Sequence, residues 1–153
     1  MSAPPDTLAF FTDRDLGAQF PDILAAAGLT VRRHRDHFPH DCPDDVWLEA
    51  VAKQGWIAVS HDARIRYKPN ERAAVVRHKA RLFVVIGKAP HPQLARNFLA
   101  TIPRIAEFVG QHAAPWIAKV YRPTATEFAS DPTTPGSVSL WYPARKGGST
   151  VRI

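Results

Sequence analysis

Five aspartates in the first half of the chain are spaced so that they could gather around a metal ion. Asp13 and Asp15 follow the apolar segment LAFFT, and Asp62 comes two residues after the apolar segment WIAVS. Asp44 and Asp45 begin a segment whose apolar residues have helical spacing. Carboxylates that lie together raise each other's pKa unless a cation lies among them. Oxygen ligands favour Mg²⁺ or Mn²⁺ over zinc, so these five residues are candidate ligands of such an ion.

A basic segment follows the last of these acids directly. Arg64, Arg66 and Lys68 stand within six residues of Asp62, and Glu71 comes shortly after them. Basic side chains neutralise and position the phosphates of a nucleic-acid backbone. A divalent ion holds phosphate oxygens, activates water and stabilises the leaving oxygen. Together, the acids and the basic segment predict the hydrolysis of a phosphodiester.

Each aspartate taken alone also has an ordinary structural interpretation. Asp13 and Asp15 are typical turn residues after a strand, and Asp62 could form an Asx turn. Asp44 is expected as the N-cap of its helix, a role that is compatible with metal binding. A metal site is favoured because acids occur at three places on one edge of the sheet: after the first strand, after the third strand and at the start of the second helix.

The elements that must position these residues alternate between strand and helix. Apolar, β-branched segments predict strands at 7–12, 29–34, 56–60 and 81–87. Helical spacing and terminal glycines predict helices at 20–27, 44–55, 71–80 and 91–113. Pro103 is expected to kink the last helix or break it in two. The segment 81–87 is continuously apolar, which indicates burial on both faces of a sheet.

This alternation predicts an α/β fold, a three-layer sandwich with a central, mainly parallel sheet of four or more strands. In such a fold the ends of the strands and the starts of the helices lie at the same edge. Ligands bind outside the carboxyl ends of the strands. The aspartates are therefore expected to converge at that edge.

The last part of the chain has a different composition. We expect one α/β domain over residues 1–122 and a basic C-terminal tail, rich in Pro, Ser, Thr and Gly, over residues 123–153. The tail is expected to be partly disordered, and 138–142 is a candidate for a short strand.

The overall composition limits the class of protein. The chain is 45% hydrophobic and 22% charged, which is ordinary for a globular protein. No apolar run approaches the ~18–20 residues of a membrane span, and the first residues lack the pattern of a secretory signal. The single cysteine, Cys42, excludes an internal disulfide and suits a reducing compartment. We therefore expect a cytoplasmic protein with no membrane partner.

The charge is distributed unevenly along the chain. Residues 1–62 contain ten acidic and five basic residues, whereas residues 63–153 contain four acidic and fifteen basic residues. An acidic part joined to a basic part predicts a cation site beside a surface for a polyanion. The alternative is a basic solvated surface that has no partner.

The motifs resemble those of the PIN-like nuclease superfamily, in particular the small PIN-like proteins related to toxins of toxin–antitoxin pairs. The resemblance covers residues 8–87 and rests on the segments FFTDRDLG, PDDVWLEAVAKQGWIAVSHDARIRYKPNE and RLFVVIG. It implies a PIN-like fold and an endoribonuclease that depends on Mg²⁺ or Mn²⁺. It also implies RNA as the substrate and a cognate antitoxin as a partner. The long helix at 91–113 is a candidate surface for the antitoxin or for a homodimer.

The resemblance also assigns roles to individual residues. Asp13 matches the acid after the first strand, and Asp44 best matches the acid of a mid-domain helix, with Asp45 and Glu49 as other candidates. Asp62 matches the acid of a Thr/Ser-x-Asp motif, in which the Ser60 hydroxyl would steer Asp62 or water. Asp15 is the first choice for a fourth acid, and Glu71 is a more distant one.

Two other functions stay open from the sequence. A receiver-type signalling domain would use Asp13, Asp15, Asp62 and Lys88 to accept a phosphoryl group, although that order needs one more strand–helix unit before the lysine. A non-catalytic module that binds nucleic acid or protein would keep the fold and lack nuclease activity.

One histidine-rich segment is not explained by these readings. His34, His37, His40 and Cys42 lie within nine residues and are residue types that bind zinc. Their spacing matches no closed zinc motif. We interpret the segment as a mobile polar loop over the entrance of the site.

Overall fold

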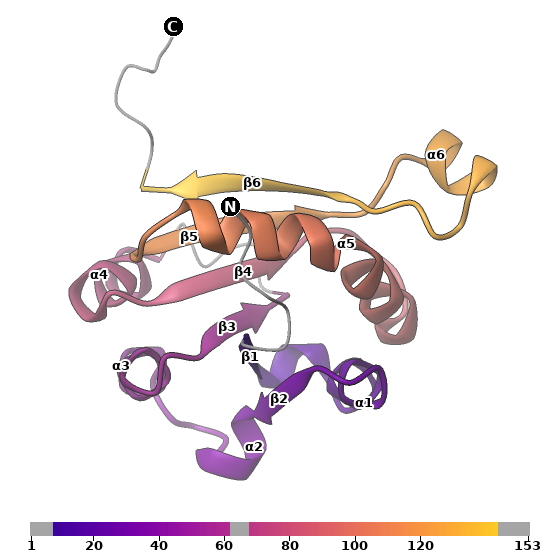
Figure 1. Ribbon diagram of the computed structural model, residues 1–153. Coiled ribbons are helices and arrows are strands. Elements are labelled where there is room, and N and C mark those ends of the chain that lie inside the picture. Colours follow the sequence, from indigo (N-terminus) through magenta and orange to yellow (C-terminus); the bar gives the residue numbers. More distant parts are fainter. Residues whose placement is uncertain (1–7, 62–67, 144–153) are drawn as a thin grey trace, which may run out of the picture.

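The computed structural model describes residues 8–61 and 68–143, and in these residues six strands form one sheet (Figure 1). The strands are β1 (Ala9–Thr12), β2 (Thr30–Arg33), β3 (Ile57–Ser60), β4 (Arg81–Val85), β5 (Trp116–Tyr121) and β6 (Ser137–Tyr142). The helices are η2 (Arg14–Leu16, a 3₁₀ turn), α1 (Gln19–Ala26), α2 (His34–His37), α3 (Asp44–Lys53), α4 (Pro69–His78), α5 (His91–Gln111) and α6 (Ala125–Ser130). The predicted α/β class and the mainly parallel sheet are confirmed.

The strand order is β2-β1-β3-β4-β5-β6. The first five strands are parallel, and β6 is antiparallel to β5. The chain moves from β1 to β2 on one side and then returns to place β3 on the other side of β1. Such a change of winding direction opens a crevice at the carboxyl ends of the two central strands. Here that crevice lies between the ends of β1 and β3.

Helices cover both faces of the sheet and make a three-layer sandwich (Figure 1). On one face, α1 and α5 bury side chains such as Phe20, Leu94 and Phe98 against the sheet. On the other face, α3 and α4 bury side chains such as Trp47 and Val75. Every residue of β3 is buried, as are the last four of β4, which confirms the prediction of burial on both faces.

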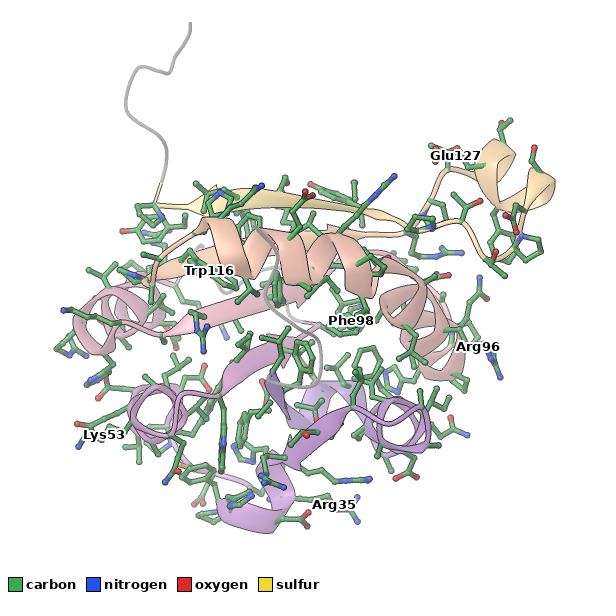
Figure 2. The ribbon with its side chains drawn as sticks, in the orientation of Figure 1. Arg35, Lys53, Arg96, Phe98, Trp116 and Glu127 are labelled. Atoms are coloured by element: carbon green, nitrogen blue, oxygen red, sulfur yellow. The ribbon has the colours of Figure 1, made fainter. Side chains whose placement is uncertain are left out.

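The long helix α5 continues through Pro103 and is not broken. Figure 1 shows its axis changing direction along its length, which is the predicted kink. Its apolar stripe, including Leu94, Phe98 and Ile105, is buried. Phe98 lies between the helix and the sheet in Figure 2, whereas Arg96 on the same helix points outward.

The segment after residue 122 contains α6 and β6. The candidate short strand at 138–142 is present as β6, and it pairs with β5 from Ile117↔Tyr142 to Tyr121↔Ser137. Its Val138 and Leu140 pack against the core on the α5 side. Residues 137–142 therefore belong to the same sheet as the strands before residue 122.

None of the helices in the described part of the chain combines the length and the apolar character that crossing a membrane requires.

Candidate active site

The end of β1 places two aspartates at the crevice. Asp13 is the N-cap of the 3₁₀ turn η2, and its Oδ1 accepts a hydrogen bond of 2.7 Å from the amide of Arg14. The amide of Asp13 donates to the carbonyl of Val59 in β3, at 2.9 Å. The strand pairing of β1 with β3 thus extends to Asp13 and fixes where this acid leaves the sheet.

Asp15 joins the ends of the two strands. Its Oδ2 accepts a hydrogen bond of 2.9 Å from the hydroxyl of Ser60, the last residue of β3. Both of its carboxylate oxygens lie 3.1 Å from the amide nitrogen of His61, which donates to them. Ser60 is buried, with 1% of its surface exposed. A carboxylate held by two donors is oriented as well as charged.

Two glycines and two histidines complete this end of the sheet. Gly17 ends the turn η2 at a φ of +68°, and a Cβ atom there would lie 2.8 Å from Nδ1 of His91. The ring of His91 lies 6.2 Å from the ring of His61. Nε2 of His61 and the carbonyl oxygen of Gly87 are 2.9 Å apart. Glycine at position 17 therefore allows His91 to approach the turn that carries the acids.

The two aspartates of α3 have other contacts. Asp44 is the first residue of the helix, and Oδ1 of its side chain accepts from the indole Nε1 of Trp47 at 2.9 Å. The expected N-cap role of Asp44 is wrong, because the extended residue Pro43 precedes the helix as its N-cap. Asp45 accepts hydrogen bonds from Arg77 and from Nε2 of His78. These bonds, from Arg77 first, hold the pKa of Asp45 below its usual range.

Asp44 and Asp45 lie with Glu71 around a hollow of about 360 Å³, where the starts of α3 and α4 meet. Cys42, Pro43 and Asn70 line the rest of this hollow. Burial raises the pKa of the Cys42 thiol, which keeps it protonated and disfavours a role as a nucleophile. Among the described residues, Asp13 and Asp15 thus lie at the ends of β1 and β3, whereas Asp44, Asp45 and Glu71 lie at the starts of α3 and α4.

Three of the predicted residues, Asp62, Arg64 and Arg66, lie outside the described residues. Lys68 is the N-cap residue of α4 and is half-buried. Glu71 is in the first turn of the same helix. The described residue directly before Asp62 is His61, whose amide is bound to Asp15 as stated above.

The donor chemistry at the end of β1 fits a hard divalent cation. Asp13 and Asp15 offer only oxygen atoms, the donors that Mg²⁺ and Mn²⁺ prefer. Within residues 8–61 and 68–143, no group of three or more His, Cys, Asp or Glu side chains is placed to hold a metal ion. The third predicted ligand of this group, Asp62, is not among those residues.

The histidine-rich segment is more ordered than expected. Residues 34–37 form the short helix α2, where a loop was expected. His34 is buried at 3% exposure, and its ring contacts those of Phe11, Phe38 and Trp47. We attribute this helix to local packing, because His34 covers the aromatic rings of Phe11 in β1 and Trp47 in α3 on this face of the sheet.

Sequence reasoning did not assign Arg14 a role. Its Nε donates to Nδ1 of His34 at 2.9 Å, and its Nη2 donates to the carbonyl of Phe38 at 2.8 Å. The one signal in the sequence was its position between Asp13 and Asp15. Its partner is twenty residues away, and no pattern in the chain indicates that contact.

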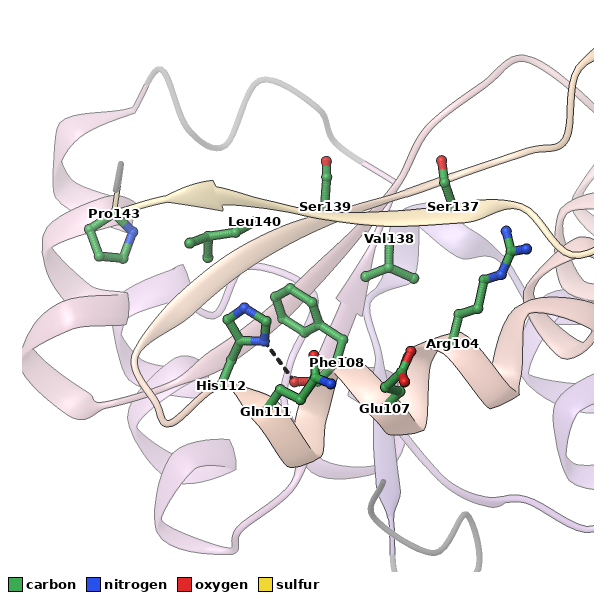
Figure 3. A pocket seen from close by; sticks show the side chains of 10 residues that line it. All are labelled: Arg104, Glu107, Phe108, Gln111, His112, Ser137, Val138, Ser139, Leu140 and Pro143. Carbon is green, nitrogen blue, oxygen red and sulfur yellow. Dashed lines mark hydrogen bonds between the residues drawn. The ribbon is translucent and has the colours of Figure 1, made fainter. Parts of the chain in front are cut away.

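A larger hollow of about 550 Å³ lies between the end of α5 and β6 (Figure 3). Figure 3 shows Val138 pointing toward α5, while Ser137 and Ser139 point to the other side of the strand. Arg104 closes one end of the hollow by donating to the carbonyl of Gly136 at 2.7 Å. The predicted site residues do not line this hollow, so we do not place the active site there.

Comparison with known proteins identifies relatives. Residues 8–87 match the model of a family described as PIN like domain. The chain is 33% identical over 117 residues to the Mycobacterium tuberculosis (strain H37Rv) protein named "Putative ribonuclease VapC45". The aligned region covers 72% of this chain and 84% of the relative. No solved structure matches the chain.

Proposed function

Because the chain belongs to the PIN-like domain family, we propose that it is a metal-dependent endoribonuclease that hydrolyses RNA phosphodiesters. The observation that carries this proposal is the pair of contacts from Ser60 and His61 to Asp15. They tie the acids after β1 to the residue directly before Asp62. Similarity to a protein named as a ribonuclease supports the choice of RNA as substrate.

In this proposal the acids divide the work of binding a cation. We assign Asp13, Asp44 and Asp62 as the catalytic acids, and Asp15 and Asp45 as residues that complete or adjust the ligand set. In this structure Asp44 and Asp45 lie in the separate group at the start of α3, where Asp45 is bound to Arg77 and His78. When bound, Mg²⁺ or Mn²⁺ supplies a Lewis acid that neutralises phosphate oxygens. Ser60 and the amide of His61 hold the Asp15 carboxylate in one orientation, as partners of metal-binding carboxylates do.

The basic residues position the substrate. Arg64, Arg66 and Lys68 follow Asp62 in the chain and bind the RNA backbone through its phosphates. Glu71, in the first turn of α4, is assigned a supporting role beside these basic residues. These assignments place the RNA across the carboxyl end of the sheet, where the parallel strands end.

We further propose that the protein is the toxin of a type II toxin–antitoxin module and acts in the cytoplasm. Its partners would be RNA and a cognate antitoxin, with the long helix α5 as a candidate surface for the antitoxin or a second copy. Co-purification of the protein with the product of a neighbouring small gene, and loss of RNA cleavage in that complex, would support this role.

The direct test is incubation of the purified protein with a mixed RNA pool in the presence of Mn²⁺, Mg²⁺ or EDTA. We expect cleavage with either metal and none in EDTA, and calorimetry is expected to show binding of Mn²⁺. Binding of RNA without cleavage under all conditions would favour the non-catalytic module. Absence of both metal binding and cleavage would exclude the proposed nuclease.

The receiver-type alternative is less consistent with the topology. In a receiver-type domain, the lysine follows the last parallel strand of the sheet. In this chain Lys88 follows β4, and one more parallel strand, β5, comes after it. Incubation with acetyl phosphate tests this alternative, and we expect no acyl phosphate to form on Asp62.

Replacement of Ser60 tests the link between the two strands. Ser60→Ala removes the hydroxyl that donates to Asp15, and we expect RNA cleavage to fall about 10-fold, the lower range for loss of an outer-shell partner. Ser60→Thr keeps the hydroxyl and is expected to retain most activity. Equal activity of the alanine variant and the wild type would show that Asp15 needs no such donor.

A further inference from the structure

Arg14 is an exposed arginine whose side chain is nevertheless held in place. Its Nε donates to Nδ1 of His34 at 2.9 Å, and its Nη2 donates to the carbonyl of Phe38 at 2.8 Å. Its backbone amide donates to Asp13. The guanidinium therefore has a defined position against His34 and Phe38, and Arg14 lines the same small hollow as Asp13.

The partner that holds Arg14 is a buried histidine in its neutral form. His34 is 3% exposed and surrounded by the rings of Phe11, Phe38 and Trp47. Nδ1 accepts a hydrogen bond only when it carries no proton. Burial lowers the pKa of His34, and the charge of Arg14 lowers it further, against an opposing effect of Asp44. The geometry and the burial thus agree on a neutral acceptor.

The two contacts leave donors available on Arg14. A guanidinium has five N–H donors, and His34 and Phe38 accept from two of its nitrogens. Among the described residues, no carboxylate forms an ion pair with Arg14. The N–H donors that His34 and Phe38 do not use are therefore available to an anionic ligand.

Other cations extend this region. Arg33 and Arg35 line the same small hollow as Asp13 and Arg14, at the ends of β1 and β2. Arg33 is paired with Asp22, whereas Arg35 is exposed. Figure 2 shows Arg35 pointing outward from α2. These arginines lie on the β2 side of the acids, because β2 is the edge strand next to β1.

We propose that Arg14 binds a phosphate of the RNA on the β2 side of the acids, and that His34 is the positioning residue that orients its guanidinium. The proposal rests on the proposed nuclease function. A planar, bidentate donor suits a phosphate, and a side chain that is already held loses less entropy on binding. RNA would then be held on the β2 side of the acidic site, in addition to the phosphate contacts proposed for the basic residues that follow Asp62 in the chain.

A purely structural role for Arg14 makes a different prediction. In that case Arg14 would only fasten α2 to the turn η2, and its loss would lower stability without affecting RNA. The two roles are separated by measuring RNA affinity and thermal unfolding on the same variants.

The experiment measures binding of a fluorescent single-stranded oligouridylate by anisotropy, in EDTA and over a range of salt concentrations. Arg14→Gln is expected to weaken binding about 10-fold at low salt, the effect of losing one charged hydrogen-bond contact. The slope of log K against log salt should fall by about 0.7, the value for one phosphate contact on a single strand. The control is Arg96→Gln on the outer side of α5, which makes the same charge change and should behave like the wild type.

His34 is tested by two further substitutions. His34→Asn keeps an acceptor near the position of Nδ1 and is expected to keep RNA affinity within about twofold, whereas His34→Leu should weaken it several-fold. The proposal would be overturned if Arg14→Gln had the same RNA affinity and the same salt slope as the Arg96→Gln control. If the wild-type protein still bound and cleaved RNA, the proposed nuclease function would stand. A wild type that neither binds nor cleaves RNA would overturn both.

Discussion

Asp13→Asn is expected to lower RNA cleavage by about 100-fold or more, since loss of even an outer-shell partner of a metal ligand costs 10–100-fold. The amide keeps the size of the carboxylate and can still accept a hydrogen bond from the Arg14 amide. It loses the negative charge that a divalent cation requires. Cleavage rates with Mn²⁺ and calorimetric titration of Mn²⁺ measure the change.

Asp36→Asn is a suitable control for this substitution. Asp36 is an exposed acid of α2, so its replacement makes the same charge change near the site without touching a proposed ligand. We expect the control to retain wild-type activity and both variants to keep the wild-type unfolding temperature. Normal cleavage by Asp13→Asn would remove Asp13 from the catalytic set.

Combining Asp13→Asn with Asp62→Asn tests whether the two acids act as a unit. Residues that share one function give losses that are far from additive. The double variant should therefore be scarcely less active than either single variant. Multiplicative losses would indicate that the two acids contribute independently, which a shared cation does not predict.

The edge of the sheet that carries Asp13 and Asp15 could be predicted from the sequence, because it depends only on strand order and parallel pairing. The predicted strands, which are five to seven residues long, are separated by helical segments, and right-handed connections then place all strand ends together. The contact of Asp15 with Ser60 is a consequence of β1 and β3 being neighbours.

The contacts of Asp45 and Arg14 could not be predicted in the same way. Asp45 is bound by Arg77 and His78, and Arg14 is bound by His34. Each contact depends on how two helices or turns are placed beside each other, and helical or strand periodicity carries no information about that. A side chain with several possible partners is assigned only when the packing is known.

Strand β5 shows another limit of sequence patterns. The segment WIAKVY was not predicted as a strand, although four of its six residues are buried. It follows the long helix closely and precedes the Pro- and Thr-rich segment, whose composition dominated the interpretation of this region. Its pairing with both β4 and β6 is a tertiary effect, and strand propensity depends strongly on such neighbours.

The largest effect on stability is expected at Phe11, the residue of β1 that faces α3. Phe11 is fully buried, and its ring lies 5.4 Å from that of Trp47, 5.8 Å from that of Phe38 and 5.9 Å from that of His34. Phe11→Ala removes the centre of this cluster and leaves a cavity. We expect the free energy of unfolding to fall by about 3–5 kcal/mol, the usual cost of a Phe→Ala change in a core.

Urea unfolding followed by tryptophan fluorescence measures this loss, with Phe128→Ala as the control. Phe128 is the one large aromatic of α6, is 36% exposed, and should change stability by no more than about 0.5 kcal/mol. A loss below 1 kcal/mol for Phe11→Ala would show that the cluster can close around the cavity.

The same variant connects the core to the proposed chemistry, because Phe11 packs against the histidine that holds Arg14 and the tryptophan that donates to Asp44. At a temperature where Phe11→Ala remains folded, we therefore expect weaker RNA binding than in Phe128→Ala, since both contacts lose their support together.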